Sequence, residues 1–140
     1  MKAWAVIGGV MAMSVAVASA ELLENRGFEE AGFSSWMTFG QGWRLGVGGD
    51  ARSGDFGAVC DVLESDGDVF RGVFQEVPVT AGHIYDASVY IRAVNVESSE
   101  SWLEIQFLDG DGGVVQQTMT VPVTADQPFT VSRLPALTAP

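Results

Sequence analysis

Hydrophobic and polar residues alternate along much of the chain beyond residue 20, and Gly, Pro, Asn and Asp break the alternation. Residues 84–94 place Tyr85, Ala87, Val89, Ile91 and Ala93 on one face and Asp86, Ser88, Tyr90 and Arg92 on the other. Residues 101–108 place Leu103, Ile105 and Phe107 on one face and Trp102, Glu104 and Gln106 on the other. A period of two residues is typical of a β-strand with one buried face. No helical stripe of useful length is evident.

The same pattern predicts further strands over residues 56–62, 69–77, 114–121 and 129–134. The run DGDGG at 109–113 indicates a hairpin turn between two of them, because Asp and Gly accommodate tight-turn backbone. Short strands recurring at this spacing are typical of an all-β fold. We therefore predict an antiparallel β-sandwich of the jelly-roll kind.

The first twenty residues have the pattern of a signal peptide. Lys2 gives a positive start, residues 3–17 are uncharged and largely apolar, and Ala18-Ser19-Ala20 is a small-x-small cleavage site. The alternative is an uncleaved membrane anchor, since about 18 apolar residues just span a bilayer. The Ala-x-Ala end favours cleavage, so we expect a secreted or periplasmic protein that has no membrane association once it is processed.

The remaining residues, 21–140, have the length of one domain with its own core. They keep all eighteen acidic residues against six arginines, for a net charge of about −12. Such a charge repels phosphate backbones and anionic lipids but is neutral toward uncharged sugars. Cys60 is the only cysteine, so no intrachain disulfide can form, and its apolar neighbours indicate a buried core thiol.

Several segments together carry a family resemblance. They are NRGFEE at 25–30 followed by Trp36, ARSG at 51–54 leading into Phe56, GVFQEVPVTAGHIY at 72–85, SVYIR at 88–92 and FLDGDGGVV at 107–115. In this order and spacing the chain resembles the galactose-binding-like jelly rolls, in particular the carbohydrate-binding modules beside bacterial xylanases and cellulases. The same outline occurs in bacterial surface proteins with no known sugar ligand.

The end of the chain departs from that pattern. Modules of this kind usually continue past a segment such as 134–140 with one or two more strands, the last of which carries an aspartate. Two interpretations follow from the resemblance: a fragment of a longer protein, for which a glycoside hydrolase is the candidate further domain, or a trimmed sandwich that lacks its C-terminal strands. A trimmed sandwich has an open edge that can pair with another chain.

Polar and aromatic side chains indicate a sugar-binding face. Tyr90 and Arg92 share a face with Trp102, Glu104 and Gln106 if their two strands pair through residues 94–99. Sugar C–H bonds stack on aromatic rings, and Arg, Glu and Gln bind hydroxyls. The alternative is an ordinary solvated face with an aromatic cross-strand pair.

Two other tryptophans take different interpretations. Trp43 lies in the Gly-rich stretch 40–49, where its ring either projects over a cleft or caps the core. Trp36 matches a core tryptophan of the family, so we leave it out of the site.

The resemblance also implies a structural calcium ion near the start of the mature domain. The matching positions are the Gly27 carbonyl, the Glu29 carboxylate and a carbonyl of the Arg52-Ser53 turn. Calcium prefers such oxygen ligands. The family's last ligand is the aspartate of the absent final strand.

Catalysis has little support in the sequence. His83 is the only histidine and lies in a turn, and no nucleophile elbow or metal-spaced His/Cys set is evident. We expect a monomeric, non-catalytic module that binds a polysaccharide or oligosaccharide and no nucleic acid. The alternative is a structural or cell-surface adhesion domain without a sugar site.

Overall fold

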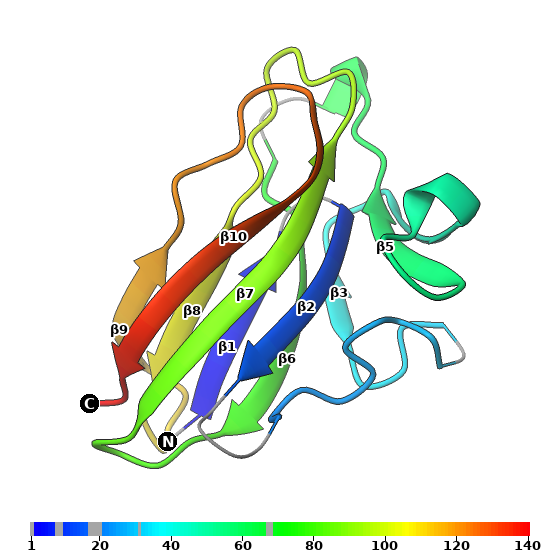
Figure 1. Ribbon diagram of the computed structural model, residues 1–140. Coiled ribbons are helices and arrows are strands. Elements are labelled where there is room, and N and C mark those ends of the chain that lie inside the picture. The colour runs from blue at the N-terminus through cyan, green and yellow to red at the C-terminus, as the bar shows by residue number, and fades with distance from the viewer. Residues whose placement is uncertain (1, 8–9, 17–20, 31, 67–68) are drawn as a thin grey trace.

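The computed structural model describes residues 2–7, 10–16, 21–30, 32–66 and 69–140. The strands of these residues form two antiparallel sheets, which face each other in the ribbon view (Figure 1). Sheet A has the order β3-β6-β1-β8-β9, and sheet B has the order β10-β7-β2-β5-β4. The predicted all-β, antiparallel sandwich is therefore confirmed.

Each sheet combines strands from distant parts of the chain. Sheet A contains β3 (Met37–Phe39), β6 (Gly72–Pro78), β1 (Lys2–Ile7), β8 (Leu103–Leu108) and β9 (Val114–Met119). Sheet B contains β10 (Gln127–Thr138), β7 (Ile84–Ala93), β2 (Val10–Ala16), β5 (Phe56–Cys60) and β4 (Trp43–Val47). Two short 3-10 turns, η1 (Gly48–Asp50) and η2 (Glu64–Asp66), lie in the connections.

The core lies between the sheets, where the period-two pattern places it. The predicted inward residues of β7 and β8 are all buried. They join side chains from both sheets and from the segment before β3: Leu23, Phe28, Trp36, Ala58, Val73, Leu134 and Leu137. The prediction that Trp36 belongs to the core is thereby confirmed. Cys60, by contrast, is only half-buried at the end of β5, so the core-thiol prediction is wrong.

Most predicted strands are present, with changes at their ends. The turn at residues 109–113 connects paired strands β8 and β9 as predicted, and the Asp109 carboxylate accepts the N–H groups of Asp111 and Gly113. Sequence patterning missed β3, which is three residues long, and β4, which lies in the Gly-rich stretch. It also predicted β10 too short, because irregular pairing after Gln127 and Leu134 interrupts the alternation.

The strands β1 and β2 fall within the predicted signal peptide. β1 pairs with both β6 and β8, and β2 pairs with β7 along its whole length and with β5 at one position. Cleavage after Ala20 remains a prediction. Among the described residues, no helix is long and apolar enough to cross a membrane.

Candidate functional site

The expected sugar face is divided between the two sheets. Tyr90 and Arg92 lie on β7, whose neighbours in sheet B are β10 and β2. Trp102 precedes β8 and Glu104 lies on it, and the neighbours of β8 in sheet A are β1 and β9. The predicted pairing of these two strands is therefore wrong: the connection at residues 94–102 crosses from one sheet to the other.

Three of the predicted residues remain together on the outer side of sheet A. The Glu104 carboxylate accepts a hydrogen bond from Trp102 Nε1 at 3.1 Å and another from Gln106 Nε2 at 2.6 Å. Glu104 is 7 % exposed, whereas Trp102 and Gln106 are half-buried. The two donors fix the orientation of the carboxylate, and the indole and amide groups border it on either side.

Apolar side chains also lie on the outer side of sheet A. The exposed Phe70 ring meets the Trp102 ring edge-to-face, with centroids 6.1 Å apart. In the register, Glu104 lies opposite Met119 of β9. On β6 the outward Phe74 contacts Phe39 of β3, also at 6.1 Å. We call this surface the sheet A face and define it by Phe39, Phe70, Phe74, Trp102, Glu104, Gln106 and Met119.

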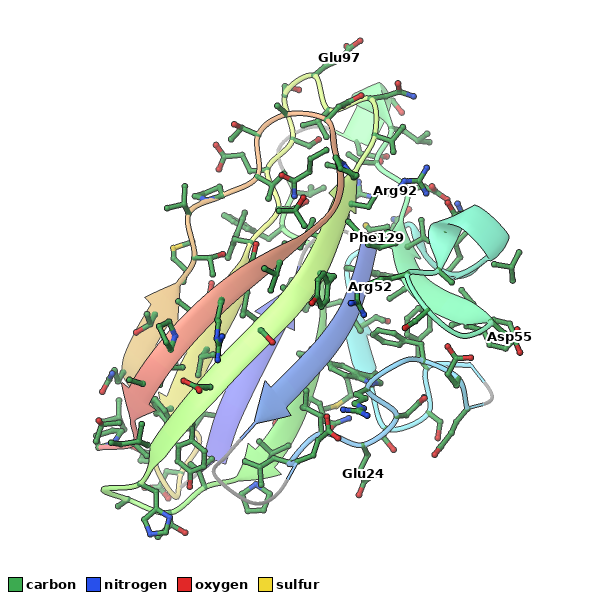
Figure 2. The ribbon with its side chains drawn as sticks, in the orientation of Figure 1. Glu24, Arg52, Asp55, Arg92, Glu97 and Phe129 are labelled. Atoms are coloured by element: carbon green, nitrogen blue, oxygen red, sulfur yellow. The ribbon has the colours of Figure 1, made fainter. Side chains whose placement is uncertain are left out.

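The other two predicted residues hold a loop on the outer side of sheet B. The guanidinium of Arg52 lies 3.5 Å from the centroid of the Tyr90 ring, so it covers one face of that ring. Arg92 donates to the Gly49 carbonyl at 2.6 Å and to the Asp50 carboxylate at 3.1 Å. Figure 2 shows Arg52 over this sheet and Arg92 toward η1. Through these contacts, Tyr90 and Arg92 hold the loop at residues 48–52 against β7.

Trp43 does not project from a loop. It is the first residue of β4, is partly buried against the core, and donates from Nε1 to the Phe39 carbonyl at 3.1 Å. Of the two interpretations left open for Trp43, the structure supports the core cap. The next residue, Arg44, pairs with Asp61 at 2.6 Å and with Asp50 at 3.3 Å. The hydrogen bond that Arg44 donates to the Asp61 carboxylate is the main reason that the pKa of Arg44 is raised above its ordinary value.

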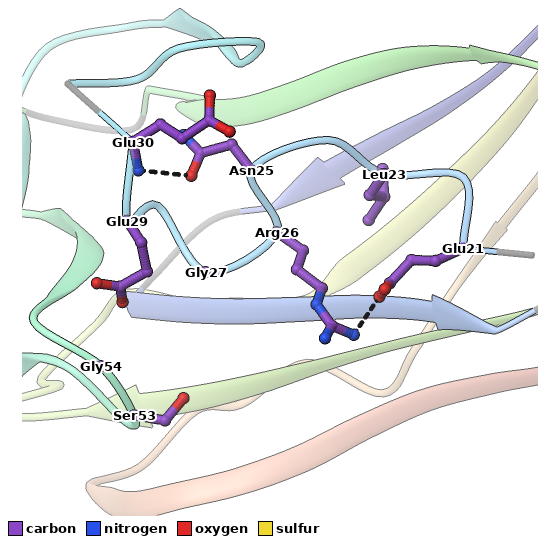
Figure 3. A pocket seen from close by; sticks show the side chains of 9 residues that line it. All are labelled: Glu21, Leu23, Asn25, Arg26, Gly27, Glu29, Glu30, Ser53 and Gly54. Carbon is purple, nitrogen blue, oxygen red and sulfur yellow. Dashed lines mark hydrogen bonds and ion pairs between the residues drawn. The ribbon is translucent and has the colours of Figure 1, made fainter.

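The predicted calcium ligands border one hollow in the loops beside sheet B (Figure 3). Its lining comprises Glu21, Leu23, Asn25, Arg26, Gly27, Glu29, Glu30, Ser53 and Gly54. Gly27, Glu29 and Ser53 are therefore brought together as the resemblance implied. The three glutamates make the lining acidic, although Glu21 pairs with Arg26.

Glu29 also has a structural role in this hollow. Its carboxylate accepts the N–H groups of Asp55 at 2.9 Å and Phe56 at 3.3 Å. Gly54 is packed against it so closely that a Cβ would lie 2.2 Å from Glu29 Oε1. Within the described part of the chain, no three His, Cys, Asp or Glu side chains gather as a metal-binding group. A calcium ion here would therefore depend on the remaining carboxylate lone pairs and on carbonyl oxygens.

Sequence reasoning missed two side chains that hold loops in place. Gln75 is 6 % exposed; it donates to the carbonyls of Glu24 and Ser35 and accepts from the Glu24 N–H group. Arg71 donates to the Gln41 carbonyl at 2.8 Å and pairs with Asp66 at 2.5 Å. An inward polar residue between Val73 and Val77 was the available signal for Gln75.

Phe70 was missed as a site residue for a different reason. It lies in the connection before β6 and is 77 % exposed. The pattern placed it inside a strand, where an aromatic side chain is as readily buried as exposed. Only the fold brings it beside Trp102.

Comparison of the chain with protein-family models, with curated proteins and with solved structures finds no match.

Proposed function

We propose that the chain is a secreted, non-catalytic module of the galactose-binding-like kind that binds a polysaccharide or oligosaccharide on the sheet A face. The observation that carries the proposal is the fixed carboxylate of Glu104, which accepts hydrogen bonds from Trp102 and Gln106, together with the exposed ring of Phe70, which packs edge-to-face on Trp102. The binding surface no longer includes Tyr90, Arg92 or Trp43.

The chemistry of this face suits an uncharged sugar. Aromatic rings and the Met119 side chain offer apolar surface to the C–H face of a pyranose, and such stacking removes apolar area from water. The second lone pair of each Glu104 oxygen and the amide oxygen of Gln106 can accept hydrogen bonds from hydroxyl groups. The net charge of −11 keeps polyanions away from the protein but does not oppose a neutral glycan.

The test is retention on a panel of insoluble and soluble glycans, including xylan, cellulose and β-glucan, in affinity electrophoresis. We expect at least one neutral glycan to retard the protein while an anionic polysaccharide does not. Retention must persist at high salt, because stacking and neutral hydrogen bonds are screened little. If no glycan on the panel retards the protein, the proposal fails.

The second candidate function is a structural or cell-surface adhesion domain without a sugar site. It is favoured by the sheet B face, where Arg52 covers the Tyr90 ring and Arg92 is bound to the loop at Gly49. The polar and aromatic side chains on this face contact a loop of the same chain, so their presence is explained without a ligand. Folded protein that binds no glycan would favour this candidate.

We also propose that calcium binds in the hollow that contains Glu29. The acidic, oxygen-rich lining supports this proposal. Because a ligand of the native state stabilises by mass action, millimolar calcium should raise the melting temperature, and Glu29→Gln should abolish the rise. Glu97→Gln is the matched control, since Glu97 is exposed and does not line the hollow. An unchanged melting curve after chelation would contradict calcium binding.

A further inference from the structure

The two strands formed by residues 2–16 occupy internal positions in both sheets. In sheet A, β1 lies between β6 and β8 and pairs with each over six residue positions. In sheet B, β2 lies between β7 and β5. Without these strands sheet A consists of the pairs β3-β6 and β8-β9, and sheet B of the pairs β10-β7 and β5-β4. Isolated strand pairs are marginal in water.

The register matches the apolar positions of residues 2–16 to the inward positions of their neighbours. On β1, Ala3, Ala5 and Ile7 pair with Val77, Gln75 and Val73 of β6, and with Phe107, Ile105 and Leu103 of β8. On β2, Met11, Met13 and Val15 pair with Ile91, Val89 and Ala87 of β7. All of these partners except Val77 are buried. The pairing therefore places residues 2–16 beside strand positions whose own side chains form the core.

We infer that residues 21–140 form a strand acceptor, which is completed when the segment 2–16 inserts one strand between β6 and β8 and another between β7 and β5. The same residues carry the predicted export signal. Processing after Ala20 would therefore remove two internal strands and expose backbone N–H and C=O groups along β6, β8, β7 and β5. The sheet A face proposed above is complete only in a chain that retains the segment or has it supplied, because β1 lies between β6 and β8. Such edges bind extended chains by backbone hydrogen bonding.

The topology allows the strand role to be separated from the export role. Lys2 pairs with Pro78 at the end of β6, and Thr138 pairs with Ile84 at the start of β7. Residues 79–83 connect these two strands, so β1 begins at the same end of the sandwich as β10 ends (Figure 1). A permuted chain can thus carry residues 2–16 after Pro140, through a Gly/Ser linker of about ten residues. In that position the segment cannot act as an N-terminal leader.

The experiment compares four purified chains: 1–140 made by cell-free synthesis, 21–140, the permuted chain, and the permuted chain with Ala5→Pro and Met13→Pro. Proline removes a backbone donor and is not accommodated in an internal strand. Urea unfolding followed by circular dichroism measures cooperativity, and light scattering after size exclusion measures mass. We expect chain 1–140 and the permuted chain to be monomers that unfold cooperatively in urea. We expect neither 21–140 nor the proline variant to be a monomer with a cooperative unfolding transition.

Three results would overturn the inference. The first is a monomeric 21–140 with the same urea midpoint as the permuted chain, which would mean that the segment adds no strands. The second is a permuted chain that remains as uncooperative as 21–140. The third is a permuted chain whose midpoint is unaffected by the two prolines. Association of 21–140 into larger species that is abolished in the permuted chain supports the inference, because it shows that the open positions are filled when the segment is supplied.

Discussion

Trp36 is 6 % exposed, and its ring centroid lies 5.0 Å from that of Phe28. Its Nε1 donates to the Asn25 carbonyl at 2.9 Å, so the one polar atom of the ring is satisfied. Trp36→Ala should therefore lower the free energy of unfolding by about 3 to 5 kcal/mol, the usual loss for a large core aromatic. Urea denaturation measures the loss. Trp102→Ala is the control: its ring lies on an outer face, and an equal loss there would contradict the assignment of faces.

Cys60 provides a test of local burial. Burial raises the pKa of the Cys60 thiol, although the positive charge of Arg71 partly opposes the shift. The native thiol therefore keeps its proton to higher pH than the thiol of the unfolded chain does. Because the thiolate is the species that reacts, alkylation by iodoacetamide between pH 7 and pH 10 should begin at higher pH in the native protein than in urea. A native profile that begins at lower pH would contradict this local environment.

At the scale of elements, Glu29 joins the segment before β3 to the turn before β5. Gly54 has a φ of +71° in this turn, and a Cβ there would displace the Glu29 carboxylate. Gly54→Ala should destabilise the protein by roughly 1 to 3 kcal/mol, from backbone strain and from loss of the N–H bonds of Asp55 and Phe56.

Gly82→Ala is the matched control for Gly54→Ala. Gly82 has a φ of +77°, but no atom lies within 4 Å of a Cβ built there. Gly82→Ala should lower the free energy of unfolding only through the strain of alanine at a positive φ, by about 1 kcal/mol. When Glu29 is also replaced by alanine, Gly54→Ala and Gly82→Ala should cause equal losses of stability, as measured by thermal denaturation. A difference that persists would show that Glu29 does not account for the extra loss at Gly54.

The positions of the strands could be predicted from the sequence more readily than which strands pair with one another. The inward faces of β7 and β8 follow from alternation, since only one face of each strand is buried. Which strand lies beside β7 depends on the connection, and residues 94–102 are long enough either to turn back or to cross between sheets. Alternation contains no information on that choice, so the sugar face was predicted as one surface and is divided in the structure.

At the scale of the whole molecule, the fold class followed from the sequence because alternation and turn residues extend over most of the chain. The candidate site followed only in part. Trp102, Glu104 and Gln106 share a face through local spacing, whereas Phe70 joins them only through the fold. The placement of residues 2–16 as strands was not foreseen, because a run of uncharged apolar residues has no period that distinguishes a leader from an internal strand.

The most direct test of the account compares ring removal on the two outer faces. Isothermal titration with the best-retained glycan would measure the affinity of Trp102→Ala, Phe70→Ala and Tyr90→Ala beside the unchanged chain. Stacking on an exposed ring is worth on the order of 1 to 3 kcal/mol by analogy with bases. Each sheet A variant should therefore bind about tenfold or more weakly, whereas Tyr90→Ala should bind as the unchanged chain does. Equal weakening by Tyr90→Ala, or none by Trp102→Ala in folded protein, would contradict the assignment of binding to the sheet A face.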